Sequence, residues 1–245
     1  MTLSAKAFQR WLQGVAPDAS TADVCRVSGI KRTTLAQQLV RGKVSVSTVV
    51  SISRAYNINP LTALAGFDGF QELAGPLQQP TRCELVSQVS TPDLLRAALA
   101  RPALHASGGR GTGFAALGPP PHATSVKNWV DAIDDGEVRH RVSAATGVAP
   151  QNYSAQLTAN RLSPELALAT SSAAGVGPAG GLVATGLITE EEAGWAPGAR
   201  QAALDSLSDG ELITLAGDRM QALGKVLRRQ EQDQAQTEKI WENLG

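Results

Sequence analysis

A run of polar side chains over residues 31–43 carries the groups that proteins use to contact DNA bases and phosphates. Arginine can donate two hydrogen bonds to guanine, glutamine can pair with adenine, and threonine can contact a thymine methyl group or a phosphate. If Leu35 and Leu39 face inward on a helix, the outward positions are Lys31, Arg32, Thr33, Thr34, Gln37, Gln38 and Arg41. Lys43 follows this helix and could reach the DNA backbone. We expect this segment to contact base edges and phosphates of double-stranded DNA.

A second polar set lies 118 residues further along the chain and contains amides but few cations. Its members are Gln151, Asn152, Ser154, Gln156, Asn160 and Arg161. Amides can contact bases, but few cations remain to hold phosphates. The carboxylates of residues 131–137 repel DNA unless they face away from it. Two interpretations stay open for this set: a second DNA contact, or a copy kept for packing or dimerisation.

Charge is balanced over the whole chain but differs between these two regions. Lys plus Arg and Asp plus Glu both number 22. Residues 1–75 carry eight basic and four acidic side chains, whereas residues 119–193 carry four basic and eight acidic ones. We therefore expect the first region to have the higher affinity for nucleic acid.

The two regions align without a gap when the sequence is shifted against itself by 118 residues. Identical pairs include Trp11 with Trp129 and Gly29 with Gly147, and hydrophobic, cap and turn positions keep the same register. We interpret this register as an internal duplication.

Each copy carries the signals of five helices. In the first copy, Ser20-x-x-Asp23 favours the start of a second helix and Gly29 favours its end. A third helix is expected over about Arg32–Val40, and the caps of a fourth and a fifth are Ser45 and Asn59-Pro60. Ser20 and Thr21 lie at a helix N-terminus, where we expect a phosphate to bind. No stretch shows the period-two alternation of a strand, so the predicted fold is all-α.

The expected domains are a first module at 1–102, a linker at 103–122 and a second module with a C-terminal helical tail at 123–245. The linker is rich in Gly, Ser and Pro, which gives a flexible connection with a stiff step at its proline run. A short extra helix is expected after each five-helix module, beginning at Thr91 and at Asp209.

The tail contains an apolar set between Ile213 and Val226. Such a set can cover the second module or pair with another chain. Self-association through the C-terminal helix is therefore one of the partner predictions.

The segment from Val27 to Gly42, followed by Ile52 to Pro60, resembles the Cro/CI-type (XRE) helix-turn-helix family. The shared pattern is a Gly-apolar step, a polar triplet, a variable third helix, another glycine and an ending similar to Ala-Leu-Gly-Val-x-Pro. The resemblance covers residues 5–70 and, more weakly, residues 123–188. The stretch from Gly29 to Gly42 is one residue longer than the commonest family spacing, so we expect a slightly extended third helix or exit loop.

This resemblance implies two tandem helix-turn-helix modules in a sequence-specific transcriptional regulator, such as a temperate-phage immunity repressor. The third helix of such a module lies in the major groove. Two linked modules would place two recognition helices on one double-stranded DNA operator. The alternative is an adaptor in which only the first module binds DNA and the acidic second module mediates protein contacts or dimerisation.

The remaining motifs predict no catalysis, no cofactor and no metal site. Gly175-x-Gly177-x-x-Gly180 matches a dinucleotide-binding pattern, but that pattern needs a preceding strand and this one follows an expected helix. The three histidines are not spaced with Cys25 or Cys83 as zinc ligands, and two cysteines cannot form a disulfide framework. No segment resembles a signal peptide or is long enough to cross a membrane. We expect a cytoplasmic protein that is not an enzyme.

Overall fold

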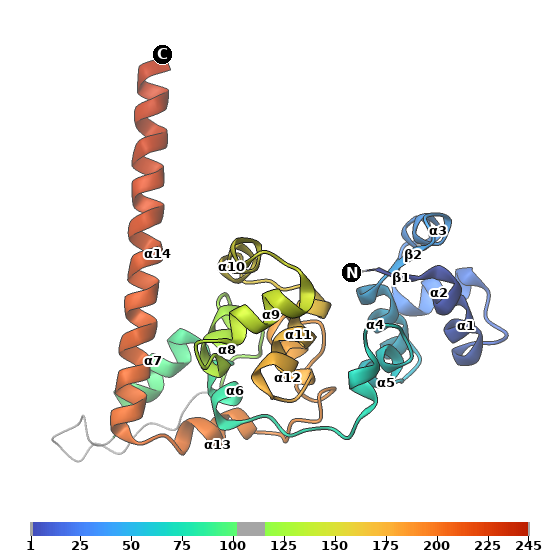
Figure 1. The fold of residues 1–245 in the computed structure, drawn as a ribbon, viewed down its shortest axis with the longest axis horizontal. Coiled ribbons are helices and arrows are strands. Elements are labelled where there is room, and N and C mark those ends of the chain that lie inside the picture. Colours follow the sequence, from blue (N-terminus) through green and yellow to red (C-terminus); the bar gives the residue numbers. More distant parts are fainter. Residues whose placement is uncertain (1, 102–115, 245) are drawn as a thin grey trace. The chain divides into compact units, whose positions relative to one another are not determined.

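The computed structural model describes residues 2–101 and 116–244, with side chains described up to residue 237. Within these ranges the chain is mostly helical and contains one small sheet (Figure 1). The prediction of an all-α fold is confirmed. Most of the predicted linker at 103–122 lies outside the described residues.

Five helices follow one another in the first part of the chain. They are α1 (Ala5–Val15), α2 (Thr21–Ser28), α3 (Arg32–Val40), α4 (Val46–Ala55) and α5 (Pro60–Ala65), with a 3-10 turn at Gln71–Ala74. The predicted caps are confirmed, because the side chains of Ser20, Ser45 and Asn59 each accept a hydrogen bond from a backbone N–H of the helix that follows. Gly29 ends α2 with φ 71° and ψ 7°, a left-handed conformation that glycine adopts without strain. The apolar faces of these helices meet in a core whose fully buried members include Phe8, Val24, Leu35, Ile52 and Leu64.

A two-stranded antiparallel sheet corrects the expectation that the chain has no strands. Strand β1 (Thr2–Ser4) pairs with β2 (Lys43–Ser45), and Leu3 lies opposite Val44. Both of these side chains are buried. Strands of three residues are too short to show an alternating pattern in the sequence.

A second series of five helices begins after residue 124. It comprises α8 (Ser125–Ile133), α9 (Val138–Thr146), α10 (Pro150–Thr158), α11 (Pro164–Ala174) and α12 (Ala179–Ala184). The bounds of α10 equal those of α3 shifted by 118 residues. Gly147 repeats the left-handed conformation of Gly29, and Asn160 repeats that of Gly42. Helix bounds and backbone turns therefore recur at the spacing found in the sequence.

Two short helices are additional to those predicted. They are α6 (Arg82–Ser87) and α13 (Ala199–Asp205), again about 118 residues apart. Each has too few residues to show a helical period. Helix α6 packs against α8, so the chain that leaves the first series of helices contributes to the core of the second.

The compact units divide the chain differently from the predicted domain boundaries. One unit contains the residues up to Gln88 together with Pro119–Arg200, and the other contains Val89–Gly118 together with the residues from Gln201 onward. The predicted boundaries at 102 and 123 therefore do not coincide with the ends of the units.

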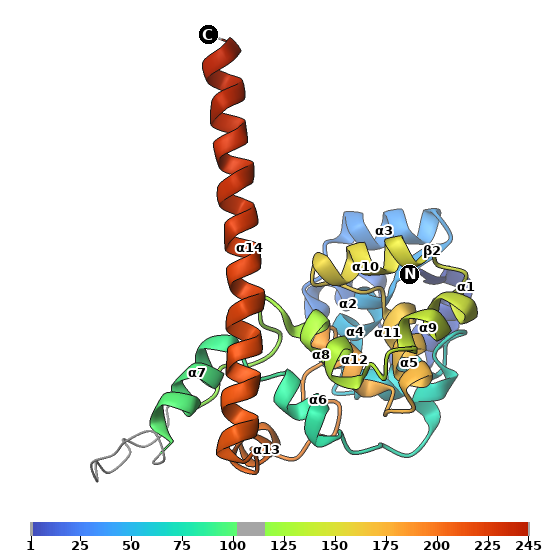
Figure 2. The same ribbon diagram turned by 60° about the vertical axis from the view of Figure 1, so that its left-hand side comes forward.

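The second unit is built around α7 (Thr91–Ala100) and α14 (Asp209–Leu244), which pack against each other. Both helices begin at the predicted residues. Helix α14 has 36 residues, so the helix predicted from Asp209 and the predicted C-terminal helical tail form one continuous helix. At 1.5 Å per residue it is about 54 Å long, against about 15 Å for α7. In Figure 2, α14 extends far beyond the end of α7 as a single straight helix.

Candidate nucleic-acid interface

Helix α3 presents an exposed polar surface. Leu35, which is 0 % exposed, fixes the inward face of the helix. The predicted residues that are exposed are Lys31, Arg32, Thr33, Thr34, Gln37, Arg41 and Lys43. Seven of the eight residues predicted between Lys31 and Lys43 are therefore accessible, on α3, at its two ends and in β2.

Four of these side chains are cations that lie at the two ends of α3. Lys31 and Arg32 lie at its N-terminus, where the helix dipole adds partial positive charge. Arg41 follows its last residue, and Lys43 is held in β2, where it pairs with Ser4. Among the described residues, none of the four forms an ion pair. Because α3 contains no acidic residue, these charges are available to an anionic ligand.

The structure places Gln38 differently from the prediction of a base contact. Its side chain is half-buried, and its Oε1 accepts hydrogen bonds from the backbone N–H of Ser45 (3.1 Å) and from Thr48 Oγ1 (3.0 Å). Gln38 therefore joins α3 to the N-terminus of α4 and sets the position of the recognition surface. Its spacing of three residues from Leu35 was the signal in the sequence, because residues i and i+3 share a helix face.

Gln156 forms the same link in the second series. Its Oε1 accepts a hydrogen bond from the backbone N–H of Ser163 (3.4 Å). This glutamine is also half-buried, so it has the same positioning contact as Gln38.

Two exposed residues of α3 were missed from the sequence. Ala36 and Val40 are both exposed, and Val40 is 88 % exposed, the highest value among the large exposed hydrophobic residues in the described part of the chain. A helix phase set by Leu35 and Leu39 places Val40 near Thr33 and Gln37 on the outward face. The phase alone could have identified both residues.

The predicted phosphate position at the start of α2 already carries a carboxylate. Ser20 Oγ accepts a hydrogen bond from the backbone N–H of Asp23 (3.2 Å) and donates one to Asp23 Oδ2 (2.6 Å). The hydrogen bond from Ser20, followed by that from Arg26, lowers the pKa of Asp23, which is therefore negatively charged at neutral pH. This negative charge opposes the phosphate contact predicted for Ser20, whereas Thr21 is exposed.

Helix α10 carries fewer of the predicted contacts than α3. Gln151, Asn152, Ser154 and Arg161 are exposed. Asn160 is half-buried, donating a hydrogen bond from Nδ2 to the carbonyl of His122 (3.0 Å) and accepting one at Oδ1 from the backbone N–H of Val126 (2.9 Å). Asn160 therefore holds the start of α8, and both ends of its amide are engaged within the protein.

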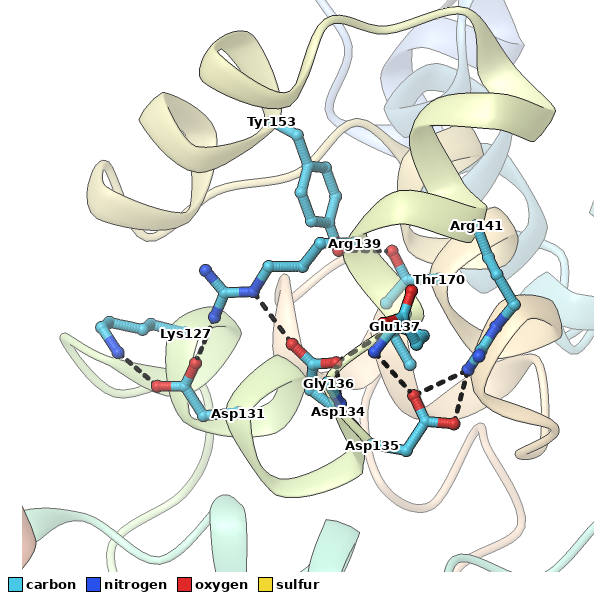
Figure 3. A network of polar contacts seen from close by, with 11 residues as sticks. Lys127, Asp131, Asp134, Asp135, Gly136, Glu137, Arg139, Arg141, Tyr153 and Thr170 are labelled. Carbon is cyan, nitrogen blue, oxygen red and sulfur yellow. Dashed lines mark hydrogen bonds and ion pairs between the residues drawn. The ribbon is translucent and has the colours of Figure 1, made fainter.

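The cations of α8 and α9 are used within the protein, as Figure 3 shows. Arg139 donates hydrogen bonds to Asp131 (2.7 Å) and Asp134 (3.0 Å), and Lys127 also pairs with Asp131. The predicted electrostatic repulsion by these carboxylates is therefore reduced by neighbouring cations.

Arg141 and Asp135 form a further ion pair in this network. Both carboxylate oxygens of Asp135 lie 2.9 Å from Arg141 Nη2. The hydrogen bond from Arg141 is the main reason that the pKa of Asp135 lies below its usual value. With Arg139 and Lys127 also paired, Arg161 is the cation near α10 that forms no ion pair within the described part of the chain.

The comparisons with known proteins found no match. No family model, no curated protein and no solved structure matches this chain. In the part of the chain that the structure describes, no helix combines the length and apolar character needed to cross a membrane.

Proposed function

We propose that this protein is a sequence-specific, double-stranded DNA-binding regulator that acts in the cytoplasm and places α3 in the major groove. The observation that carries the proposal is the exposed, acid-free helix with unpaired cations at both ends. Lys31 and Arg32 would hold phosphate at one end and Arg41 and Lys43 at the other. The uncharged residues between them would then face the base edges.

The similarity to the XRE helix-turn-helix family supports this geometry. In such modules the second of two helices enters the groove while the first crosses the DNA backbone. Here α2 and α3 are joined by the tight turn at Gly29, and Gln38 fixes α3 against α4. The recurrence of helix bounds at 118 residues supports an internal duplication and a repressor whose two recognition helices contact one operator.

The two helices would contribute unequally to this operator. Most cations near α10 form ion pairs with aspartates of the protein. A cation in such a pair neutralises a DNA phosphate, and so releases counterions, less readily than a free cation does. We assign most of the phosphate affinity to the first module. The alternative function is an adaptor in which α10 contacts a protein partner and DNA affinity resides in α3 alone.

Full-length variants can distinguish these functions, whereas fragments cut near residue 102 would separate α6 from α8. The wild type is first used to select bound sequences from a random duplex pool. Its affinity for the selected duplex is then compared with those of Arg41→Ala and Arg161→Ala by fluorescence anisotropy. Lys225→Ala, which removes one exposed cation from α14, is the charge-matched control.

A loss of affinity in both Arg41→Ala and Arg161→Ala, with none in Lys225→Ala, supports two recognition helices on one operator. A loss in Arg41→Ala alone supports the adaptor. Failure of the wild type to select or bind any duplex would overturn the proposed function in both forms.

A second proposed property is self-association through α14, for which an apolar stripe is the specific observation. Leu212 and Ala216 of α14 are buried, and α14 packs against α7, but Met220, Leu223 and Leu227 are 56 %, 47 % and 47 % exposed. Together with Ile213 and Ala216 they follow the alternating three- and four-residue spacing of a coiled coil. The stripe continues an existing helix–helix contact beyond the end of α7, so a second copy of α14 is the occupant that fits this spacing.

A further inference from the structure

The outward face of α3 is dominated by methyl groups and a single amide. Thr33, Ala36 and Val40 each present a methyl group, and Gln37 lies among them. All four side chains are exposed. This face is uncharged, although cations lie at both ends of the helix.

Neither packing nor helix propensity explains Val40. Its side chain is 88 % exposed, so it contributes little to the core. Valine is also a poorer helix former than the charged and amide residues common on exposed helix faces. A single exposed hydrophobic residue is common in proteins, but this one shares its face with two other methyl-bearing residues and is flanked by free cations. That combination suits an anionic ligand that has methyl groups of its own.

Building on the proposed function, we infer that α3 recognises thymine methyl groups in the major groove of an A·T-rich site. Thymine is the base that presents a C5 methyl group there, and alanine, threonine and other apolar side chains contact it. Gln37 can pair with N6 and N7 of adenine. The four flanking cations would hold the phosphates on either side of these bases.

Cytosine is disfavoured by the same surface. Its major-groove edge presents the N4 amino donor, which is usually recognised by a carboxylate. Helix α3 has no carboxylate. The uncharged face of α3 therefore offers methyl groups to thymine and lacks the carboxylate that usually recognises cytosine.

The corresponding face of α10 is more polar. Shifting by 118 residues places Gln151, Ser154, Ala155 and Thr158 at the positions of Thr33, Ala36, Gln37 and Val40. All four are exposed. If α10 also contacts DNA, its half-site should depend less on methyl groups, and the two half-sites should differ in sequence.

Replacement of thymine by deoxyuridine tests this inference, because the two bases differ by the C5 methyl group alone. The full-length protein is used with the duplex that it selects from a random pool. Each thymine is replaced in turn, and the affinity is measured by fluorescence anisotropy at one fixed salt concentration. We expect at least two adjacent positions at which the replacement weakens binding about 4-fold, the effect of one buried methyl group.

Val40→Ala links one of these positions to the helix. This variant should bind the thymine duplex more weakly and should lose the sensitivity to deoxyuridine at one position. Val27→Ala, the same change at a half-exposed site on α2, is the matched control and should keep every sensitivity. Circular dichroism of both variants should show unchanged helix content.

Two results would overturn the inference while leaving the proposed function intact. The first is salt-dependent binding to a selected duplex that is insensitive to deoxyuridine at every position. The second is a selected site with G·C pairs at the positions protected by α3. Absence of binding to any duplex overturns both the inference and the proposed function.

Discussion

Trp129 donates a hydrogen bond from its indole Nε1 to Glu84 Oε1 over 3.2 Å, and both side chains are buried. Glu84 lies on α6, the helix that follows the first series, and Trp129 lies on α8, the first helix of the second series. The hydrogen bond therefore holds α6 against α8. The carboxylate also accepts a hydrogen bond from the backbone N–H of Thr81 at the start of α6. Helix α6, which follows the first series, is therefore part of the buried core of the second series.

Gly181→Ala should destabilise the protein because the added methyl group would clash with the indole ring of Trp129. A Cβ at residue 181 would lie 2.7 Å from Trp129 Cη2 and 3.0 Å from the carbonyl oxygen of Ala167. Overpacking of this kind costs about 1–3 kcal/mol of unfolding free energy. Thermal or urea unfolding followed by circular dichroism measures the change.

Gly217→Ala is the control for that substitution. A Cβ at residue 217 meets no atom within 4 Å, and the residue lies inside α14. This variant should be stabilised by about 0.5–1 kcal/mol, because alanine is the better helix former. Equal stabilities of the two variants would contradict the packing described around Trp129.

Gln38→Ala should weaken the junction between α3 and α4. It removes the acceptor for Ser45 N–H and for Thr48 Oγ1, at a cost of about 1–3 kcal/mol of unfolding free energy. Gln38→Glu keeps the acceptor oxygens and should restore most of the stability. If both variants unfold as the wild type does, Gln38 has no positioning role and a base contact becomes the better interpretation.

Glu192→Gln should remove a pH-dependent contribution to stability. Arg54 donates hydrogen bonds to Glu192 Oε1 (2.6 Å) and Oε2 (2.7 Å), and this pairing lowers the pKa of Glu192 from its usual value. The pKa of Glu192 is lower in the folded state than in the unfolded state. The stabilisation by this ion pair is therefore complete above the unfolded-state pKa, and it is lost as the pH falls through the folded-state pKa.

The melting temperatures of wild type and Glu192→Gln measure this contribution. They should differ at neutral pH and converge as the pH falls through the lowered, folded-state pKa of Glu192. Arg26→Ala, which breaks an exposed pair with Asp23 inside α2, is the control and should change the melting temperature less. A difference between wild type and Glu192→Gln that grows as the pH falls would be inconsistent with the lowered pKa.

Leu223→Asp should abolish self-association through α14. The substitution places a charge in the apolar stripe, which is unfavourable in a coiled-coil seam. Ala222→Asp introduces the same charge at the neighbouring exposed position outside the stripe and should leave the oligomeric state unchanged. Sedimentation equilibrium distinguishes the variants, and a monomeric wild type at all concentrations would rule out this property.

Helix bounds and caps could be predicted from the sequence because their causes are local. Ser20, Ser45 and Asn59 each cap a helix within three residues of the chain. The end of α2 at residue 29 has a left-handed backbone conformation, and glycine is the residue that adopts it without strain. The exposure of most of the polar residues of α3 followed from the phase set by Leu35.

The remaining features depend on contacts between distant residues. Asn160 accepts a hydrogen bond from the backbone N–H of Val126, which lies 34 residues away in the sequence. Glu84 accepts one from the indole of Trp129, which lies 45 residues away. Neither separation leaves a periodic pattern in the sequence. The hydrogen bonds of Gln38 to Ser45 and Thr48 could not be predicted from its residue type, because an amide can serve both as a base contact and as an acceptor for backbone N–H groups.

The salt dependence of operator affinity tests the central claim most directly. The dissociation constant of the full-length protein on its selected duplex is measured over a range of salt concentrations. The wild type is compared with a variant in which Lys31, Arg32, Arg41 and Lys43 are all alanine. If α3 holds phosphates, the slope of log affinity against log salt should become shallower by about 0.9 for each phosphate that the variant no longer neutralises. A variant that keeps both the affinity and the slope of the wild type would contradict the assignment of α3 as the DNA-binding helix.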